Sequence, residues 1–213
     1  MVSSKTVQIK LLMGGVSIAI SIAAYGIYLW QTSKAGGTQP HPFSWLLWGL
    51  ATGVAYVVQA STGAGAGSWV SGFTAVMCIV IGLFSLFKHR WQFVIFDWLS
   101  LVAGLILLVY YLLAKNLLSS AIFATAMDVV GYGPTVKKGW AKPYDDSVSS
   151  FLLNCIKFIP ALYALNSYSV TTWLYPSTLV FVNGAVALML SLRRRKVAPD
   201  IHDCEPPPPR FNS

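Results

Sequence analysis

The sequence predicts an all-α integral membrane protein with seven transmembrane helices. Of the 213 residues, 55% are hydrophobic and only 10% are charged, and the mean hydropathy is +0.62. Soluble domains carry about 25% charged residues, so this chain has too few charges to cover a surface that faces water. Seven apolar stretches also follow one another, each close to the roughly 20 residues that a helix needs to cross about 30 Å of hydrocarbon. They cover residues 8–30, 43–60, 69–87, 91–114, 118–136, 149–166 and 174–192.

The seven stretches divide into three helices, one connecting helix and three further helices. Residues 8–87 hold the first three-helix bundle, residues 91–114 the connecting transmembrane helix, and residues 118–195 the second three-helix bundle. Residues 196–213 form a tail with four consecutive prolines, which predicts a disordered cytoplasmic segment. Two bundles joined in this way are typical of transporters that bind their solute between two repeats.

Lysine and arginine are concentrated in alternate loops. Most of them follow the first, third, fifth and seventh stretches, whereas the loops around residues 61–68 and 167–173 have none. Because positive residues stay on the cytoplasmic side, we expect the N-terminus outside and the C-terminus inside. The net charge of +8 is then an orientation signal, and no nucleic-acid partner is expected. The expected location is the plasma (inner) membrane, with the lipid bilayer as the surrounding partner.

A shift of about 104–106 residues aligns the two bundles with each other. It pairs Leu46-Leu47 with Leu152-Leu153, and Lys88-His89-Arg90 with Arg194-Arg195-Lys196. Three helices leave the chain pointing the opposite way, and the connecting helix restores its direction, so the bundles would form a parallel repeat about an axis along the membrane normal. Each bundle also has a proline in the loop before its second helix, Pro40 and Pro143.

This plan resembles the SWEET sugar transporters and their wider PQ-loop relatives, over about residues 8–195. The Pro-Gln pair of that family lies near the inner end of the first helix of each repeat. Trp30-Gln31 in the first copy and Pro134-Thr135 in the second each keep half of the pair, and the string from Gly131 to Lys138 is the better preserved copy. The resemblance implies a carrier that moves a small polar solute, sugar or amino-acid-like, by alternating access.

The resemblance also implies where the solute binds. In SWEET-type transporters an asparagine on the third helix of each triple and aromatic residues on the second helices line a central pocket. Asn183 matches that asparagine in the second copy, whereas Met77 stands at the first-copy position. Trp48 lies on the second helix of the first bundle, and its repeat partner is Asn154. An alternative for Trp48 is an interfacial belt residue beside Trp45.

Polar residues at membrane depth mark the same region. Asp128 and Lys157 both fall near the middle of their helices, with Asn154 one turn from Lys157 and Asn183 at comparable depth. Ionisable groups inside a bilayer are costly and usually functional, so we expect Asp128 and Lys157 to pair. Asp128 would then couple transport to a proton, and Trp48 would bind solute together with Lys157 and the two asparagines. A static pair that holds helices together is the alternative.

Two helices contain candidate hinges. Pro134 removes a helical N–H group and lies beside Gly131, which predicts a bend near the inner end of the fifth helix. A proline that only ends this helix is the alternative. Pro160 is predicted midway along the sixth helix, where it would bend the helix and free a carbonyl.

No enzyme is predicted. The histidines have no metal-ligand spacing, no glycine-rich phosphate loop precedes a helix, and no nucleophile has a base at a suitable spacing, so neither a metal nor a cofactor is expected. The predicted function is transport of a small polar solute, either passive or proton-coupled through Asp128. The alternative is a receptor-like or scaffold membrane protein on the same fold. Since both bundles are on one chain, the protein would act as a monomer or as a homo-oligomer.

Overall fold

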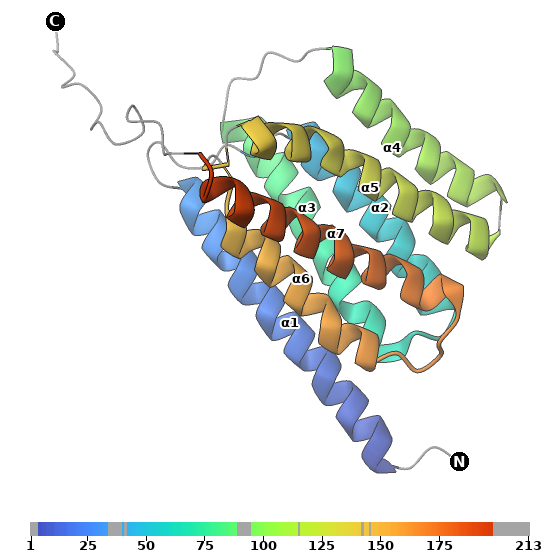
Figure 1. Ribbon diagram of the computed structural model, residues 1–213. Coiled ribbons are helices and arrows are strands. Elements are labelled where there is room, and N and C mark those ends of the chain that lie inside the picture. The colour runs from blue at the N-terminus through green and yellow to red at the C-terminus, as the bar shows by residue number, and fades with distance from the viewer. Residues whose placement is uncertain are drawn as a thin grey trace, which may run out of the picture.

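The computed structural model describes residues 4–33, 40, 42–88, 95–114, 116–141, 143–144 and 146–197. In these ranges the chain forms seven α-helices and one short 3₁₀-helix, and no strand (Figure 1). The helices are α1 (Ser4–Ser33), α2 (Pro42–Ser61), η1 (Gly65–Ser68), α3 (Trp69–Lys88), α4 (Ile95–Ala114), α5 (Leu117–Ala141), α6 (Val148–Tyr163) and α7 (Val170–Arg194). The prediction of an all-α chain with seven helices is confirmed for this part of the chain.

Each predicted apolar stretch corresponds to one α-helix, and the differences lie at the ends. The α5 helix continues to Ala141, five residues past the predicted end, because hydropathy detects only the apolar part of a helix. Polar caps set the starts of the last two helices: Ser147 Oγ accepts a hydrogen bond from Ser150 N, and the Thr172 hydroxyl accepts one from Ser169 N. Residues 91–94 and the tail beyond residue 197 lie outside the described residues.

Several of the described helices have the length and apolar surface that a membrane-spanning segment needs. Four are long and apolar enough to cross a membrane, and two shorter apolar helices accompany them. Large apolar side chains cover the outside of the bundle, for example Phe87, Leu113 and Phe181. Such a surface would be unstable in water, so the fold is compatible with an integral membrane protein. The four helices that meet the length criterion span Ser4–Trp30, Pro42–Ser61, Gly65–Lys88 and Val170–Arg194.

The helices lie side by side, and successive helices run in opposite directions (Figure 1). Helix α2 packs against α3, α4 and α5, while α1 packs against α3 and α6. Helix α7 packs against α5 and α6. Helix α4 contacts α2 and α5 and lies at one edge of the bundle in Figure 1.

Small residues allow these helices to approach closely. Ala51, Ala55, Ala121, Ala124 and Ala161 are all buried in the central apolar cluster. Packing between membrane helices has no help from water, so close contact through small side chains replaces the hydrophobic driving force. Larger side chains fill the remaining space between these contacts, among them Val58, Val70, Leu107, Phe158 and Tyr175.

The α2–α3 hairpin (residues 62–68) packs directly against the α6–α7 hairpin (residues 164–169). Asn166 N donates a hydrogen bond of 3.1 Å to the Ala64 carbonyl, and Lys10 Nζ of α1 donates one of 2.7 Å to the Leu165 carbonyl. Gly67 allows this approach, since a Cβ there would lie 2.7 Å from the Ala161 carbonyl oxygen and 2.9 Å from Leu165 N. Alanine at this position therefore meets backbone atoms that cannot move aside.

The first prediction concerns this contact. Gly67→Ala is expected to lower the unfolding temperature in detergent, because overpacking costs about 1–3 kcal/mol. The matched control is Gly15→Ala on α1, where no heavy atom lies within 4 Å of the added Cβ. This control should melt at or above the wild-type temperature, because alanine is favoured over glycine in a helix by about 1 kcal/mol. Equal melting of Gly67→Ala and wild type would contradict the close contact of the hairpins.

Candidate functional site

Lys157 of α6 is held between α1 and α3 by neutral side chains. It is 0% exposed, and its Nζ donates hydrogen bonds to the Tyr25 hydroxyl at 3.1 Å and to Thr74 Oγ1 at 3.0 Å. The ammonium group also lies 4.5 Å from the centre of the Tyr25 ring and 5.1 Å from that of Phe158, within the range of cation–π attraction. Cys78 Sγ is 3.9 Å from the Tyr25 hydroxyl. We call Tyr25, Thr74, Cys78 and Lys157 the lysine cluster.

Asp128 of α5 lies in a second group of polar side chains. It is 3% exposed, and its Oδ1 accepts a hydrogen bond of 3.1 Å from the Tyr175 hydroxyl of α7. The same hydroxyl lies 2.6 Å from Thr52 Oγ1 of α2. Because Tyr175 uses its hydrogen on Asp128, Thr52 is the donor in the second bond. We call Thr52, Asp128 and Tyr175 the aspartate cluster.

The expected direct pair of Asp128 and Lys157 does not form. The two groups interact electrostatically, but within the described residues each has other hydrogen-bond partners. The prediction considered charges alone and left out the hydroxyl groups, which can bind a lysine or a carboxylate through directed hydrogen bonds. Hydroxyl groups of Tyr25, Thr74 and Tyr175 occupy the positions that an opposite charge was expected to take.

The two asparagines bond to their own helices. Asn183 is buried, and its Nδ2 donates to the Leu179 carbonyl at 2.8 Å. The half-buried Asn154 donates in the same way to the Ser150 carbonyl at 3.0 Å. These bonds use only the amide nitrogen of each side chain, so each amide oxygen can still accept a hydrogen bond. Asn183 also interacts with Tyr132 of α5, which brings it to the helix that carries Asp128.

Trp48 belongs to an interior group of aromatic rings. Its ring centre is 5.8 Å from that of Trp45 and 5.6 Å from that of Tyr132 on α5. Trp45 in turn contacts Tyr25 and Tyr28 of α1, so both tryptophans face neighbouring helices. This packing favours the interior position over an interfacial belt. Trp48 Nε1 is buried and, among the described atoms, has no hydrogen-bond partner.

The predicted hinges have mixed outcomes. Gly131 lies directly against the Trp48 indole, which leaves no space for a Cβ. The α5 helix runs through position 134 to Ala141, so the alternative in which Pro134 ends this helix is wrong. The Pro134 side chain lies outside the described residues. Pro160 lies in the last turn of α6 and not midway along it, because the helix ends at Tyr163.

The residues that complete both clusters were not singled out from the sequence. Tyr25, Thr52, Thr74 and Tyr175 are common residue types in membrane helices, and nothing in their local pattern marks them. One signal was present: Tyr25 lies on the inward face of an otherwise apolar helix that also places Ser17 and Ser21 inside. A polar stripe on one side of a membrane helix indicates contact with other helices and not with lipid.

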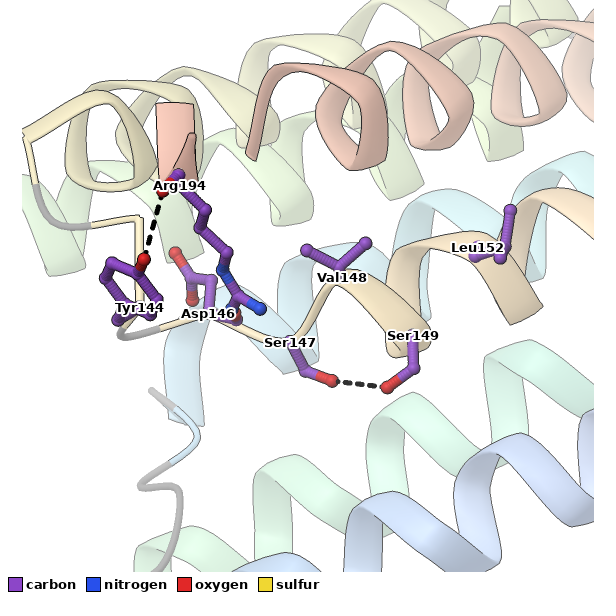
Figure 2. Close-up of a pocket in the computed structure, with 7 residues that line it drawn as sticks. All are labelled: Tyr144, Asp146, Ser147, Val148, Ser149, Leu152 and Arg194. Carbon is purple, nitrogen blue, oxygen red and sulfur yellow. Dashed lines mark hydrogen bonds between the residues drawn. The ribbon is translucent and has the colours of Figure 1, made fainter. Parts of the chain in front are cut away.

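A surface pocket of about 530 Å³ lies where α6 begins and α7 ends (Figure 2). Arg194 occupies one side, but its guanidinium donates to the carbonyl oxygens of Pro143 at 2.9 Å and Asp146 at 2.6 Å. The Tyr144 hydroxyl donates back to the Arg194 carbonyl at 3.0 Å (Figure 2). These bonds fasten the α5–α6 loop to the end of α7, so this arginine serves structure more than ligand binding.

No group of three or more metal-binding side chains occurs among the described residues, and the three histidines lie outside them. No protein-family model, curated protein or solved structure matches the chain. The resemblance to SWEET and PQ-loop proteins therefore stays a prediction from the sequence.

The second prediction tests the aspartate cluster. Tyr175→Phe removes the hydroxyl that donates to Asp128, and a hydrogen bond between membrane helices contributes about 0.6 kcal/mol on average and up to about 1.7 kcal/mol. We expect a lower unfolding temperature in detergent. Tyr163→Phe is the matched control, because this residue is 58% exposed and its hydroxyl makes no hydrogen bond to the described residues. A Tyr175→Phe protein as stable as wild type would show that the cluster does not hold α2, α5 and α7 together.

Proposed function

We propose that this chain is a membrane transporter with seven transmembrane helices in a SWEET- and PQ-loop-like plan of three, one and three. It would move a small polar solute by alternating access, as α1–α3 and α5–α7 rock against each other. Helix α4 would be the connecting helix. The observation that carries the proposal is the composition of the two buried clusters, each of which joins one triple of helices to the other.

The neighbour relations of the helices support a two-fold repeat. Exchanging α1 with α5, α2 with α6 and α3 with α7 turns each packed pair among these six helices into another packed pair, while α4, which packs on α2 and α5, stands outside the exchange. Within the triples, α1 packs on α3 as α5 packs on α7, and α2 packs on α3 as α6 packs on α7. Between them, α1 packs on α6 as α5 packs on α2. A parallel repeat about one axis predicts these correspondences.

Hydrogen bonds at the loop end, although made by different side chains, hold comparable loops in the two triples. In the first triple, the Ser85 hydroxyl near the end of α3 donates to the carbonyl of Pro40, which precedes α2. In the second, the Arg194 guanidinium at the end of α7 donates to the carbonyl of Pro143, which precedes α6. Lys88, which the sequence shift pairs with Arg194, donates to the Thr32 carbonyl at 2.9 Å. Similar loops are thus fastened at similar places.

The clusters follow the same exchange. The lysine cluster takes residues from α1 and α3 and its cation from α6. The aspartate cluster takes residues from α5 and α7 and its threonine from α2. Each cluster therefore crosses the boundary between the triples, and rocking must rearrange both. Hydrogen bonds between membrane helices contribute only about 0.6 kcal/mol on average, so a polar solute could replace such partners at modest cost.

The positive-inside pattern assigns the hairpin end of the bundle to the outside. The packing of Gly67 on Ala161 and Leu165 supports a conformation that is closed on that side. The N-terminus would then be outside and the C-terminus in the cytoplasm of a plasma (inner) membrane. One chain carries both triples, so a monomer could transport, alone or within a homo-oligomer. Asp128 would accept a proton when rocking separates it from Tyr175, which couples conformation to protonation.

The third prediction is solute flux through the purified protein. Proteoliposomes should accumulate at least one member of a panel of sugars and amino acids, and an imposed proton gradient should change the rate. Asp128→Asn should retain flux along the solute gradient and lose the response to the proton gradient. Empty liposomes and the Tyr163→Phe protein serve as controls.

Two results would count against this proposal. Flux that responds to protons equally in wild type and Asp128→Asn would refute coupling through this carboxyl. No flux of any solute by a folded protein would favour the receptor-like or scaffold alternative.

A further inference from the structure

We propose that the solute carries a carboxylate and that Lys157 is its binding partner, with Tyr25 and Thr74 as neighbouring donors. This inference rests on the proposed transport function and names the chemical class of the solute. It follows from the imbalance of donors and acceptors around a fully enclosed lysine.

Among the described residues, every hydrogen bond of the Lys157 ammonium group goes to a neutral group. Two of its hydrogens go to the hydroxyl oxygens of Tyr25 and Thr74, and the faces of the Tyr25 and Phe158 rings lie nearby. Hydroxyl groups and rings stabilise a buried cation only in part, because the desolvation of one charge is fully offset only by an opposite charge. A carboxylate that enters the cluster would supply that charge.

The lysine cluster contains more donor hydrogens than acceptors for them. The ammonium group brings three hydrogens, and Tyr25, Thr74 and Cys78 bring one each. Tyr25 and Thr74 already accept bonds from Lys157, and the Thr74 hydroxyl also bonds to Tyr25. The third ammonium hydrogen and the Tyr25 hydrogen therefore remain for another acceptor, with Cys78 Sγ as a weak one at 3.9 Å from the Tyr25 hydroxyl. A carboxylate has only acceptor positions and can accept several such bonds at once.

A further buried donor on the boundary between the triples lacks an acceptor. Trp48 Nε1 has no hydrogen-bond partner among the described atoms; it lies against Gly131 of α5, and its ring is linked to Tyr25 through Trp45. A sugar brings neutral hydroxyl groups, which can accept hydrogen bonds but do not supply a negative charge opposite Lys157. A single lysine with neutral helpers fits one negative charge better than the two of a phosphate group.

Asp128 does not supply the missing charge. Its carboxylate is bonded to Tyr175 in the aspartate cluster, on α5 and not on the helices that surround Lys157. It does interact electrostatically with Lys157, and it would disfavour an anion bound too close to it. The experiment must therefore separate two kinds of solute. One is an amino acid, whose ammonium group could face Asp128, and the other is a simple monocarboxylate.

The test compares matched probes that differ in charge. Purified protein is titrated with acetate, lactate, alanine, lactamide and glucose, and binding is read from tryptophan fluorescence and thermal stabilisation. Uptake of the same radiolabelled probes is measured in proteoliposomes. We expect binding of lactate or alanine and none of lactamide, which has the shape of lactate without its charge.

Variants at Lys157 connect this selectivity to the proposed site. Lys157→Gln should weaken binding of the carboxylate roughly 10- to 100-fold, as expected for the loss of a charge-assisted hydrogen bond. Lys157→Arg keeps the charge and should retain part of the affinity, which also covers the case in which the glutamine variant is unstable. Lys5→Gln on the exposed start of α1 is the matched control and should bind as wild type does.

The outcomes separate this inference from the proposed function. Carboxylate binding that Lys157→Gln abolishes supports the inference, and the same binding without uptake overturns the transport proposal alone. Uptake of glucose that Lys157→Gln leaves unchanged supports transport and overturns the inference. Equal binding of lactate and lactamide, or no binding of any carboxylate, also overturns it.

Discussion

The polar groups that these apolar helices carry inward need partners away from water, and this constraint organises the molecule. Lys157 reaches two hydroxyl groups on α1 and α3, and Asp128 reaches Tyr175 on α7. An unbonded polar group in such surroundings costs several kcal/mol, which is comparable with the stability of a whole domain. The clusters therefore fix which helices are neighbours, while small residues such as Ala161 set how closely these helices approach.

The same bonds that select neighbours also leave room for change. Both clusters consist mainly of hydroxyl groups, which can donate or accept and can exchange one partner for another. By contrast, the hairpin end depends on backbone contacts without spare space at Gly67. A bundle that is tight at one end and held by exchangeable polar bonds in its interior is suited to opening and closing, which is the physical basis of the proposed rocking motion.

How far the sequence predicts this structure differs between its parts. All seven helices were predictable because hydropathy depends on local composition, and their ends differ by a few residues where polar caps such as Ser147 decide. The burial of Asp128, Lys157 and Asn183 was also expected. Their partners were not, since Tyr25 and Thr52 come from distant helices and carry ordinary hydroxyl groups. The position of Pro160 was misjudged because apolar residues continue past the end of α6.

Accessibility of Cys78 tests the central claim most directly, since this buried thiol lies in the lysine cluster and needs no knowledge of the solute. In a protein carrying Cys155→Ser and Cys204→Ser, a small charged thiol reagent that does not cross membranes is applied from either side of oriented proteoliposomes. If the two triples rock, Cys78 should react with reagent added on either side of the membrane, because each side gains access to the thiol in turn. The reaction should be much slower than that of the unfolded chain. Reaction from one side only, or from neither, would contradict alternating access through this boundary.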